Sequence, residues 1–295
     1  MSEKNTNSNL KIWGLLIILA LIWGSSFILI KKGLTGLDPL QLAGLRILSA
    51  GLVLLPWSLP NFKKIPLKKY RYVIMVGIIG NLIPAFLFAY SQQFIKSSMA
   101  GMLNGLTPMF TLIIGAAIFS DRITSKKVWG ILIGLIGSCA LLFIGSDGEL
   151  GEFNVYALLV ILATICYGTG INIIKAKLQG IKSTTTSSIS LLFTLPFGFF
   201  YLLFDGYFGE LLQNEVMQIS SIYILILGVL GTGFAVMMFY KLVELANPLT
   251  ASTVTYLIPF VAVLWGVFDG ERLFVMHFIC LTIILVGVFM INRAK

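Results

Sequence analysis

Two prolines lie inside long apolar stretches of this sequence, and each follows a polar residue by four positions. Pro108 follows Asn104, and Pro259 follows Thr255. Proline lacks an amide hydrogen and leaves the carbonyl four residues earlier without its helical hydrogen bond. A freed carbonyl beside an amide or hydroxyl side chain can bind a polar solute. We therefore interpret Pro108 and Pro259 as kinks that gate a central cavity; the alternative is a kink packed against a neighbouring helix.

Two other apolar stretches carry a second set of polar and aromatic side chains. The segments Trp23–Leu34 and Tyr167–Leu178 align without a gap and share four of twelve positions. Their side chains can contact a solute, but hydroxyls in membrane helices equally often bond to their own backbone. An asparagine is costly in lipid, which favours an inward-facing position. The candidate solute contacts are Trp23, Ser25, Ser26, Asn81, Asn104, Tyr167, Thr169, Asn172 and Thr255.

Two tyrosines at corresponding places, Tyr90 and Tyr240, complete the candidate contacts. Either tyrosine can gate a cavity or belong to an aromatic belt at the membrane surface, and the belt is the slightly better interpretation. Lys31 stands at the end of an apolar run, where a lysine is typically a snorkelling anchor.

Arg46 is the one basic residue well inside an apolar run. A charge within the hydrocarbon is costly and marks a functional hypothesis by default. The alternative is that its long side chain snorkels outward. Asp38, near the same end of the run, is a candidate partner for the guanidinium.

The composition says what kind of protein positions these residues. Of the 295 residues, 58% are hydrophobic and 11% are charged, against roughly 25% charged in soluble domains. A soluble globule, a disordered chain and a collagen-like fibre are excluded, and an integral membrane protein remains. The net charge of +9 does not indicate nucleic-acid binding, because the basic residues form short clusters between apolar runs.

The apolar runs predict an all-α membrane protein with ten transmembrane helices. A helix needs about 20 residues to cross the hydrocarbon core. Sixteen of the 21 lysines and arginines fall on the side of the N-terminus, so both termini are predicted to be cytoplasmic. The ten runs are Ile12–Ile30, Leu40–Leu59, Tyr72–Gln92, Ser98–Phe119, Val128–Gly145, Phe153–Ile174, Ser187–Phe204, Ile219–Tyr240, Leu249–Phe268 and Leu273–Ile291.

The matching segments divide the chain into two repeats of five helices, residues 12–145 and 153–291. Because five is odd, the second repeat is inverted relative to the first, which is typical of secondary transporters. No deep carboxylate, phosphate-binding loop or metal-ligand spacing is present. The sequence therefore predicts no enzyme, no cofactor and no metal. It favours exchange or facilitated diffusion of neutral, zwitterionic or amphipathic solutes.

The whole chain resembles the EamA-type ten-helix permeases of the drug/metabolite transporter superfamily. The resemblance rests on Trp23–Phe27, Arg46, Ala100–Pro108 and the tails Phe119–Arg122 and Asp269–Arg272. It implies an inner-membrane exporter or exchanger of amino acids, metabolites or drugs, acting as a monomer or homodimer in the lipid bilayer. The second repeat departs from the first in lacking a counterpart of Arg46. An importer or proton-coupled permease is the main alternative, and a channel or lipid-acting enzyme fits less well.

Overall fold

The computed structural model describes residues 2–119, 124–144, 153–245 and 254–293, and all elements assigned within these ranges are helices. The predicted junction between the repeats and most of the predicted tail Phe119–Arg122 lie outside the described residues. The all-helical prediction is therefore confirmed for the part of the chain that the structure describes.

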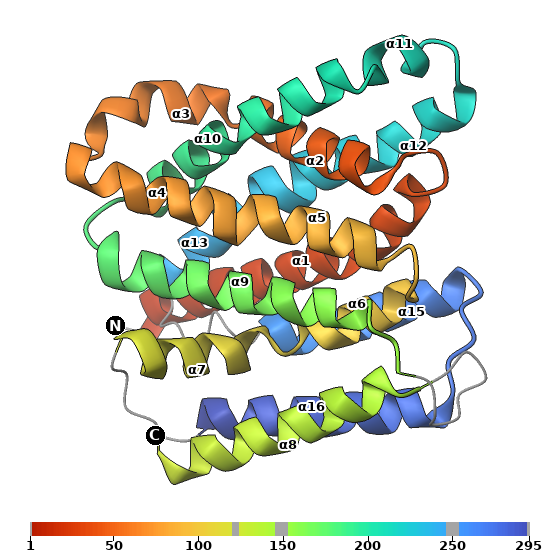
Figure 1. The fold of residues 1–295 in the computed structure, drawn as a ribbon. Helices are drawn as coiled ribbons and strands as arrows, with labels where there is room; N and C mark the ends of the chain where they lie inside the picture. Colours follow the sequence, from red (N-terminus) through yellow and green to blue (C-terminus); the bar gives the residue numbers. More distant parts are fainter. Residues whose placement is uncertain (1, 120–123, 145–152, 246–253, 294–295) are drawn as a thin grey trace.

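Helices of the first half overlap the predicted runs, but several runs are divided into shorter elements. Figure 1 shows their arrangement. They are α1 (Ser2–Gly33), α2 (Pro39–Val53), α3 (Leu55–Asn61), α4 (Tyr70–Gly77), the π-helix η3 (Ile78–Leu82), α5 (Ile83–Ser91), α6 (Ser97–Asn104), α7 (Thr107–Phe119) and α8 (Ser125–Leu142), with short 3-10 turns at Phe62–Lys64 and Leu67–Lys69.

The second half repeats this succession of helices. They are α9 (Ala157–Lys177), α10 (Ser183–Phe204), α11 (Tyr207–Leu211), α12 (Glu215–Ile226), the π-helix η4 (Leu227–Phe234), α13 (Ala235–Leu245), α15 (Val254–Phe268) and α16 (Val275–Arg293).

Within the described ranges, seven helical segments are long and apolar enough to cross a membrane. Pro39–Val53 with Leu55–Lys64 makes an eighth if this pair, bent by 60°, is one span. Two of the predicted spans are shorter apolar helices, Val254–Phe268 and Val275–Ile291. The count of ten spans and the cytoplasmic side therefore stay predictions. The start of α1 and the end of α16 do lie at the same end of the molecule (Figure 1).

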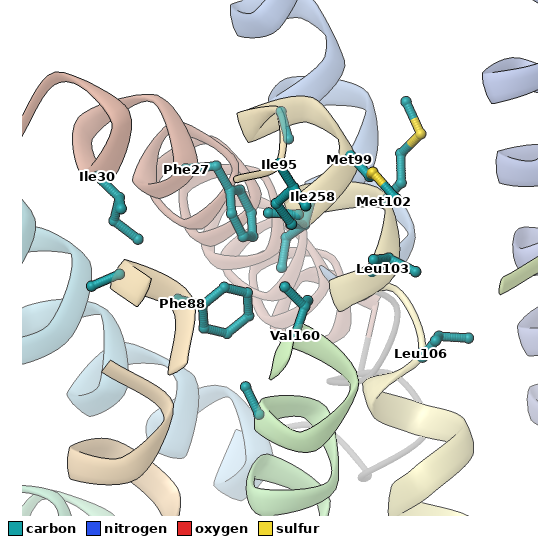
Figure 2. Packing of buried hydrophobic residues seen from close by; sticks show 14 of the residues in the cluster. Phe27, Ile30, Phe88, Ile95, Met99, Met102, Leu103, Leu106, Val160 and Ile258 are labelled. Carbon is teal, nitrogen blue, oxygen red and sulfur yellow. The ribbon is translucent and has the colours of Figure 1, made fainter. Parts of the chain in front are cut away.

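The surface and the interior are both apolar, as expected for a protein surrounded by lipid. Phe204 and Phe268 are 84% and 79% exposed, which water would penalise and lipid does not. Figure 2 shows the interior where α1, α5, α9 and α15 meet, with Phe27, Phe88, Val160 and Ile258 directed toward one another. These helices surround the site described below.

Helices α8 and α16 lie side by side at one edge of the molecule (Figure 1). Glycines allow their backbones to approach closely: a Cβ on Gly287 would lie 2.5 Å from the backbone nitrogen of Gly134. Small residues at helix contacts are the usual means of close packing in lipid, where van der Waals contact replaces the hydrophobic effect. This pair is a tightly packed flank of the fold.

Candidate solute-binding cavity

A cavity of about 150 Å³ lies in the interior, lined by residues of both halves of the chain. The lining comes from α1, α2, α4, η3, α5, α6 and α7 on one side and from α9, η4, α13 and α15 on the other. Helices α8 and α16 contribute none of the described lining residues. A cavity of roughly this volume holds a benzene-sized molecule. Side chains with a polar atom in the lining are Trp23, Ser26, Arg46, Asn81, Asn104, Thr107, Tyr167, Thr232, Tyr240 and Thr255.

The structure gathers most of the candidate solute contacts at this cavity, although they are far apart in the sequence. The candidates that line it are Trp23, Ser26, Arg46, Asn81, Asn104, Tyr167, Tyr240 and Thr255. The candidates outside the lining are Ser25, Tyr90, Thr169, Asn172, Pro108 and Pro259.

Two of the candidates outside the lining use their hydroxyls within the helix framework. Ser25 donates to the Leu21 carbonyl at 2.7 Å and accepts a hydrogen bond from the Trp265 indole at 2.8 Å. Thr169 donates to the Ile165 carbonyl at 2.9 Å. Bonding to the backbone one turn earlier satisfies a hydroxyl in lipid, and these side chains are structural in this conformation.

Asn172 and Tyr90 also lie away from the cavity. The Asn172 amide donates to the Thr111 carbonyl at 2.8 Å and to the Gly168 carbonyl at 2.9 Å, which joins α9 to α7. Tyr90 is 47% exposed and packs with Phe94 in a group of surface aromatic rings. This position corresponds to the aromatic-belt interpretation. Tyr240, its counterpart, lines the cavity instead.

The two prolines differ in their local structure. Helix α6 ends at Asn104 and α7 begins at Thr107, so the backbone is interrupted just before Pro108. The Asn104 carbonyl that Pro108 leaves free accepts a hydrogen bond from the Thr107 hydroxyl at 2.8 Å. Helix α15 instead runs through Pro259 without an interruption. The predicted matched pair of kinks is thus a break in one half and a continuous helix in the other.

Arg46 is buried, with 8% of its surface exposed, and lines the cavity. Its Nε donates to the Thr232 hydroxyl at 2.8 Å, and the Tyr167 hydroxyl is also close enough to interact with it. The candidate partner Asp38 is engaged elsewhere, because it caps α2 by accepting hydrogen bonds from the amides of Leu40 and Gln41. The snorkelling alternative is therefore wrong for this structure, and the guanidinium lies inside the protein.

Two π-helical segments, η3 and η4, occupy corresponding places in the two halves and both line the cavity. They contribute Asn81 and Thr232, and the Gly231 carbonyl of η4 accepts a hydrogen bond from the Trp23 indole at 3.0 Å. π-helical turns are rare and occur frequently at functional sites. Neither these segments nor Thr232 are predicted from the sequence; the glycines around each segment are the signal that could indicate them.

At the end where α1 finishes, charged residues form an ion-pair cluster of Lys31, Lys32, Asp269 and Glu271. The Lys31 ammonium lies 2.8 Å from an Asp269 oxygen and 2.9 Å from a Glu271 oxygen, and Lys32 also pairs with Asp269. Lys31 is therefore ion-paired, rather than the snorkelling anchor that the sequence predicted.

Glu271 also holds the start of α6. It accepts hydrogen bonds from the backbone amides and hydroxyls of Ser97 and Ser98, at 2.5 to 3.1 Å. Burial raises the pKa of Glu271. The hydrogen bonds from Ser98, Lys31 and Ser97 together outweigh this effect, so the pKa lies below its ordinary value. Hydrogen bonds from Lys31 and Lys32 likewise lower the pKa of Asp269. Both carboxylates are thus ionised at neutral pH.

Aromatic rings of the cavity pack against one another near this cluster. Phe27, one helical turn before Lys31, packs edge-on against Phe88 at a centroid distance of 5.7 Å. Phe88 in turn stacks on Tyr167 at 6.0 Å. These three rings line the cavity, and the ion-pair cluster follows one turn later along α1. Among the described residues, no group of histidine, cysteine, aspartate and glutamate could hold a metal ion.

Comparison with known proteins identifies relatives of this architecture. The model of the EamA-like transporter family matches residues 11–143 and 154–293. The uncharacterized inner membrane transporter YedA of Escherichia coli K12 is 27% identical over 97% of this chain and 92% of its own. A solved crystal structure superposes with a TM-score of 0.62 and 16% identity over 94% of both chains, which shows a shared fold.

Two further relatives have names that mention a solute. A protein of Salmonella typhimurium named as a probable amino-acid metabolite efflux pump is 29% identical over 46% of this chain and 44% of its own. An S-adenosylmethionine/S-adenosylhomocysteine transporter of Chlamydia muridarum is 26% identical over 60% of this chain and 57% of its own.

Proposed function

The chain belongs to the EamA-like transporter family, and on this premise we propose that it exports or exchanges small organic solutes by alternating access. It is a multi-pass protein of the inner membrane, and the names of its relatives point to transport rather than catalysis. The observation that carries the proposal is the interior cavity, which places polar side chains of both halves around one space inside the protein.

The proposed mechanism uses the two halves as the moving parts. A transporter exposes one central site to each side of the membrane in turn, by relative motion of its repeats. In this proposal the ion-pair cluster and the Phe27–Phe88 contact form the gate at one end of the cavity. In the alternate state these contacts separate and the opposite end closes. The break at Asn104–Thr107 and the two π-helical segments are the backbone positions where such bending requires the least disruption of regular helix.

The driving force in this proposal is the gradient of the solute itself or of an exchanged solute. The described residues lining the cavity include no aspartate, glutamate or histidine that could carry a coupling proton through the membrane. Asp121 and the side chain of Glu244 lie outside the described part of the chain. Export is the proposed direction, in line with the efflux pump named among the relatives. An importer or proton-coupled permease is the alternative.

The test is efflux from proteoliposomes preloaded with a labelled mixture of amino acids and metabolites, with and without a pH gradient. We expect selective loss of a solute class without the gradient. Loss only with the gradient would favour the proton-coupled alternative, and no selective loss would reject the proposal.

Neighbouring serines provide matched variants for this assay. Both hydroxyls donate to the carbonyl one turn earlier, Ser25 to Leu21 and Ser26 to Ile22. They differ in that Ser26 lines the cavity, whereas Ser25 lies outside it and accepts a hydrogen bond from the Trp265 indole. We expect Ser26→Val to lower efflux and Ser25→Val to leave it close to wild type. Equal effects of the two substitutions would show that efflux does not depend on this cavity.

A further inference from the structure

The cavity contains one cation, Arg46, and the structure gives it no anion. Its Nε is held by the Thr232 hydroxyl at 2.8 Å, a neutral partner from the other half of the chain. Among the residues that the structure describes, Arg46 forms no ion pair, and no carboxylate belongs to the cavity lining. A buried charge without a counter-ion is costly, and proteins normally pair it.

Four carboxylates of the described chain have partners of their own. Asp38 caps α2, Asp205 accepts a hydrogen bond from Gln41 at 2.7 Å, and Asp269 and Glu271 belong to the ion-pair cluster. None of these four is free to neutralise the guanidinium. An anion from outside the protein would neutralise the Arg46 guanidinium.

We propose that the transported solute is an organic monoanion whose carboxylate pairs with Arg46. This inference rests on the proposed function and names the class of its solute. The guanidinium is planar and binds a carboxylate through two parallel hydrogen bonds. Thr232 occupies Nε and the Tyr167 hydroxyl lies close to the guanidinium. Both partners are neutral, so within the described residues the guanidinium has no anion, and a solute carboxylate could supply one. The charges in the cavity favour an anion over the neutral or zwitterionic solutes that the sequence predicted, because the described lining has no carboxylate for an ammonium group.

The other lining residues indicate the shape and size of the rest of the solute. The rings of Trp23, Phe88, Tyr167 and Phe239 border the cavity, and such rings favour a flat apolar body. The volume of about 150 Å³ suits a body of benzene size. One cation neutralises one negative charge, so a doubly charged phosphate ester would keep an unpaired charge inside the membrane. A small aromatic carboxylate meets all three conditions.

The test compares four probes that share one ring and differ in charge: benzoate, benzamide, benzylammonium and phenylglycine. Each is added at equal concentration to the purified full-length protein, and the rise in unfolding temperature reports binding to the folded state. We expect benzoate to stabilise the protein most. Equal stabilisation by all four probes, or preference for phenylglycine or benzylammonium, would overturn the proposal.

Variants of Arg46 connect this preference to the guanidinium. We expect Arg46→Gln to weaken benzoate binding about ten- to a hundredfold, the loss expected for hydrogen bonds to a charged group. Benzamide is neutral and should still bind Arg46→Gln, which also shows that the variant is folded. Arg46→Lys keeps the charge without the planar pair of donors and should retain a weaker preference for benzoate. An unchanged preference in Arg46→Gln would overturn the assignment.

Thr232→Val gives a second measurement if Arg46→Gln does not fold. It removes only the hydroxyl that orients the guanidinium, so benzoate binding should weaken by about threefold or more while benzamide binding stays the same. No change in benzoate binding to Thr232→Val would count against the proposal.

Running the efflux assay on the same protein separates the two proposals. Selective efflux without a preference for benzoate overturns the anion assignment and keeps the transporter. Arg46-dependent benzoate binding without any efflux supports the anion site and rejects the transport function. Both positive results support both proposals.

Discussion

Pro108 and Pro259 occupy corresponding places in the two halves, yet only Pro108 follows a break in the helix. Gly105 lies three residues before the first proline. The Thr107 hydroxyl donates a hydrogen bond to the Asn104 carbonyl at 2.8 Å. The segment before Pro259 has no glycine, and α15 continues through it. A proline alone therefore does not decide whether a membrane helix breaks; neighbouring residues that satisfy or release the backbone decide it.

Other corresponding positions have diverged in the same way. Tyr240 lines the cavity while Tyr90 lies at the surface. Arg46 in the first half provides the charge, and Thr232 in the second half provides the hydroxyl that holds it. The two halves share a succession of helices but contribute different chemistry to one cavity.

The largest difference between the halves is expected from the prolines. Pro108→Ala restores the amide that allows one continuous helix, which is favoured by about 3 kcal/mol over a helix with an interior proline. Turnover in proteoliposomes should fall at least about tenfold, whereas Pro259→Ala should change it by less than about threefold because α15 is already continuous. Equal losses in the two variants would show that the break has no special role.

The glycines of the α8–α16 flank give the next largest difference, in stability rather than turnover. A Cβ on Gly287 would lie 2.5 Å from the backbone nitrogen of Gly134, which cannot move aside. A Cβ on Gly137, its counterpart, first meets the Ile283 side chain at 2.9 Å. Gly287→Ala should lower the free energy of unfolding by about 1–3 kcal/mol, and Gly137→Ala by less. Thermal unfolding in detergent measures both, and the reverse order would contradict this account of the packing.

The ion-pair cluster joins the two halves, and its effect should depend on pH. Because the pKa of Glu271 is lowered in the folded protein, its contribution to stability is full above the ordinary carboxyl value and is lost as the pH falls through the lowered one. Glu271→Gln should cost about 1.5–3 kcal/mol at pH 7.

The unfolding temperature of Glu271→Gln should also change less between pH 6 and pH 3 than that of the wild type. Ser138→Ala, which removes a hydroxyl bonded to its own helix, serves as a control that keeps the wild-type pH dependence. A Glu271→Gln profile parallel to the wild type would show that the cluster does not stabilise the fold.

The smallest expected difference concerns the two tyrosines. Tyr240→Phe removes a hydroxyl from the cavity, so the KM for the solute should rise up to about tenfold, as expected for one lost hydrogen bond. Tyr90→Phe removes a hydroxyl at the surface and should leave KM unchanged. A rise in KM for Tyr90→Phe as large as that for Tyr240→Phe would contradict the expected difference between the two tyrosines.

Much of the fold follows from local properties of the sequence. Apolar runs of about 20 residues predict helices in lipid, because every backbone polar group there must be satisfied within its own helix. The same runs make an isolated polar or charged residue conspicuous. The sequence therefore predicts site roles for Trp23, Asn81, Asn104 and Arg46, and all four line the cavity.

Other features were decided by packing between residues distant in the sequence. Arg46 bonds to Thr232, 186 residues away, and Lys31 bonds to Glu271, 240 residues away. Ser25 and Ser26 are neighbours with the same side chain, yet only Ser26 lines the cavity. Hydropathy and spacing report which residues are costly to leave in lipid, but the rotation of each helix against its neighbours determines which of them meet. Local sequence properties therefore account for the class of protein and most of its helices, whereas packing between helices selects the polar groups that share one site.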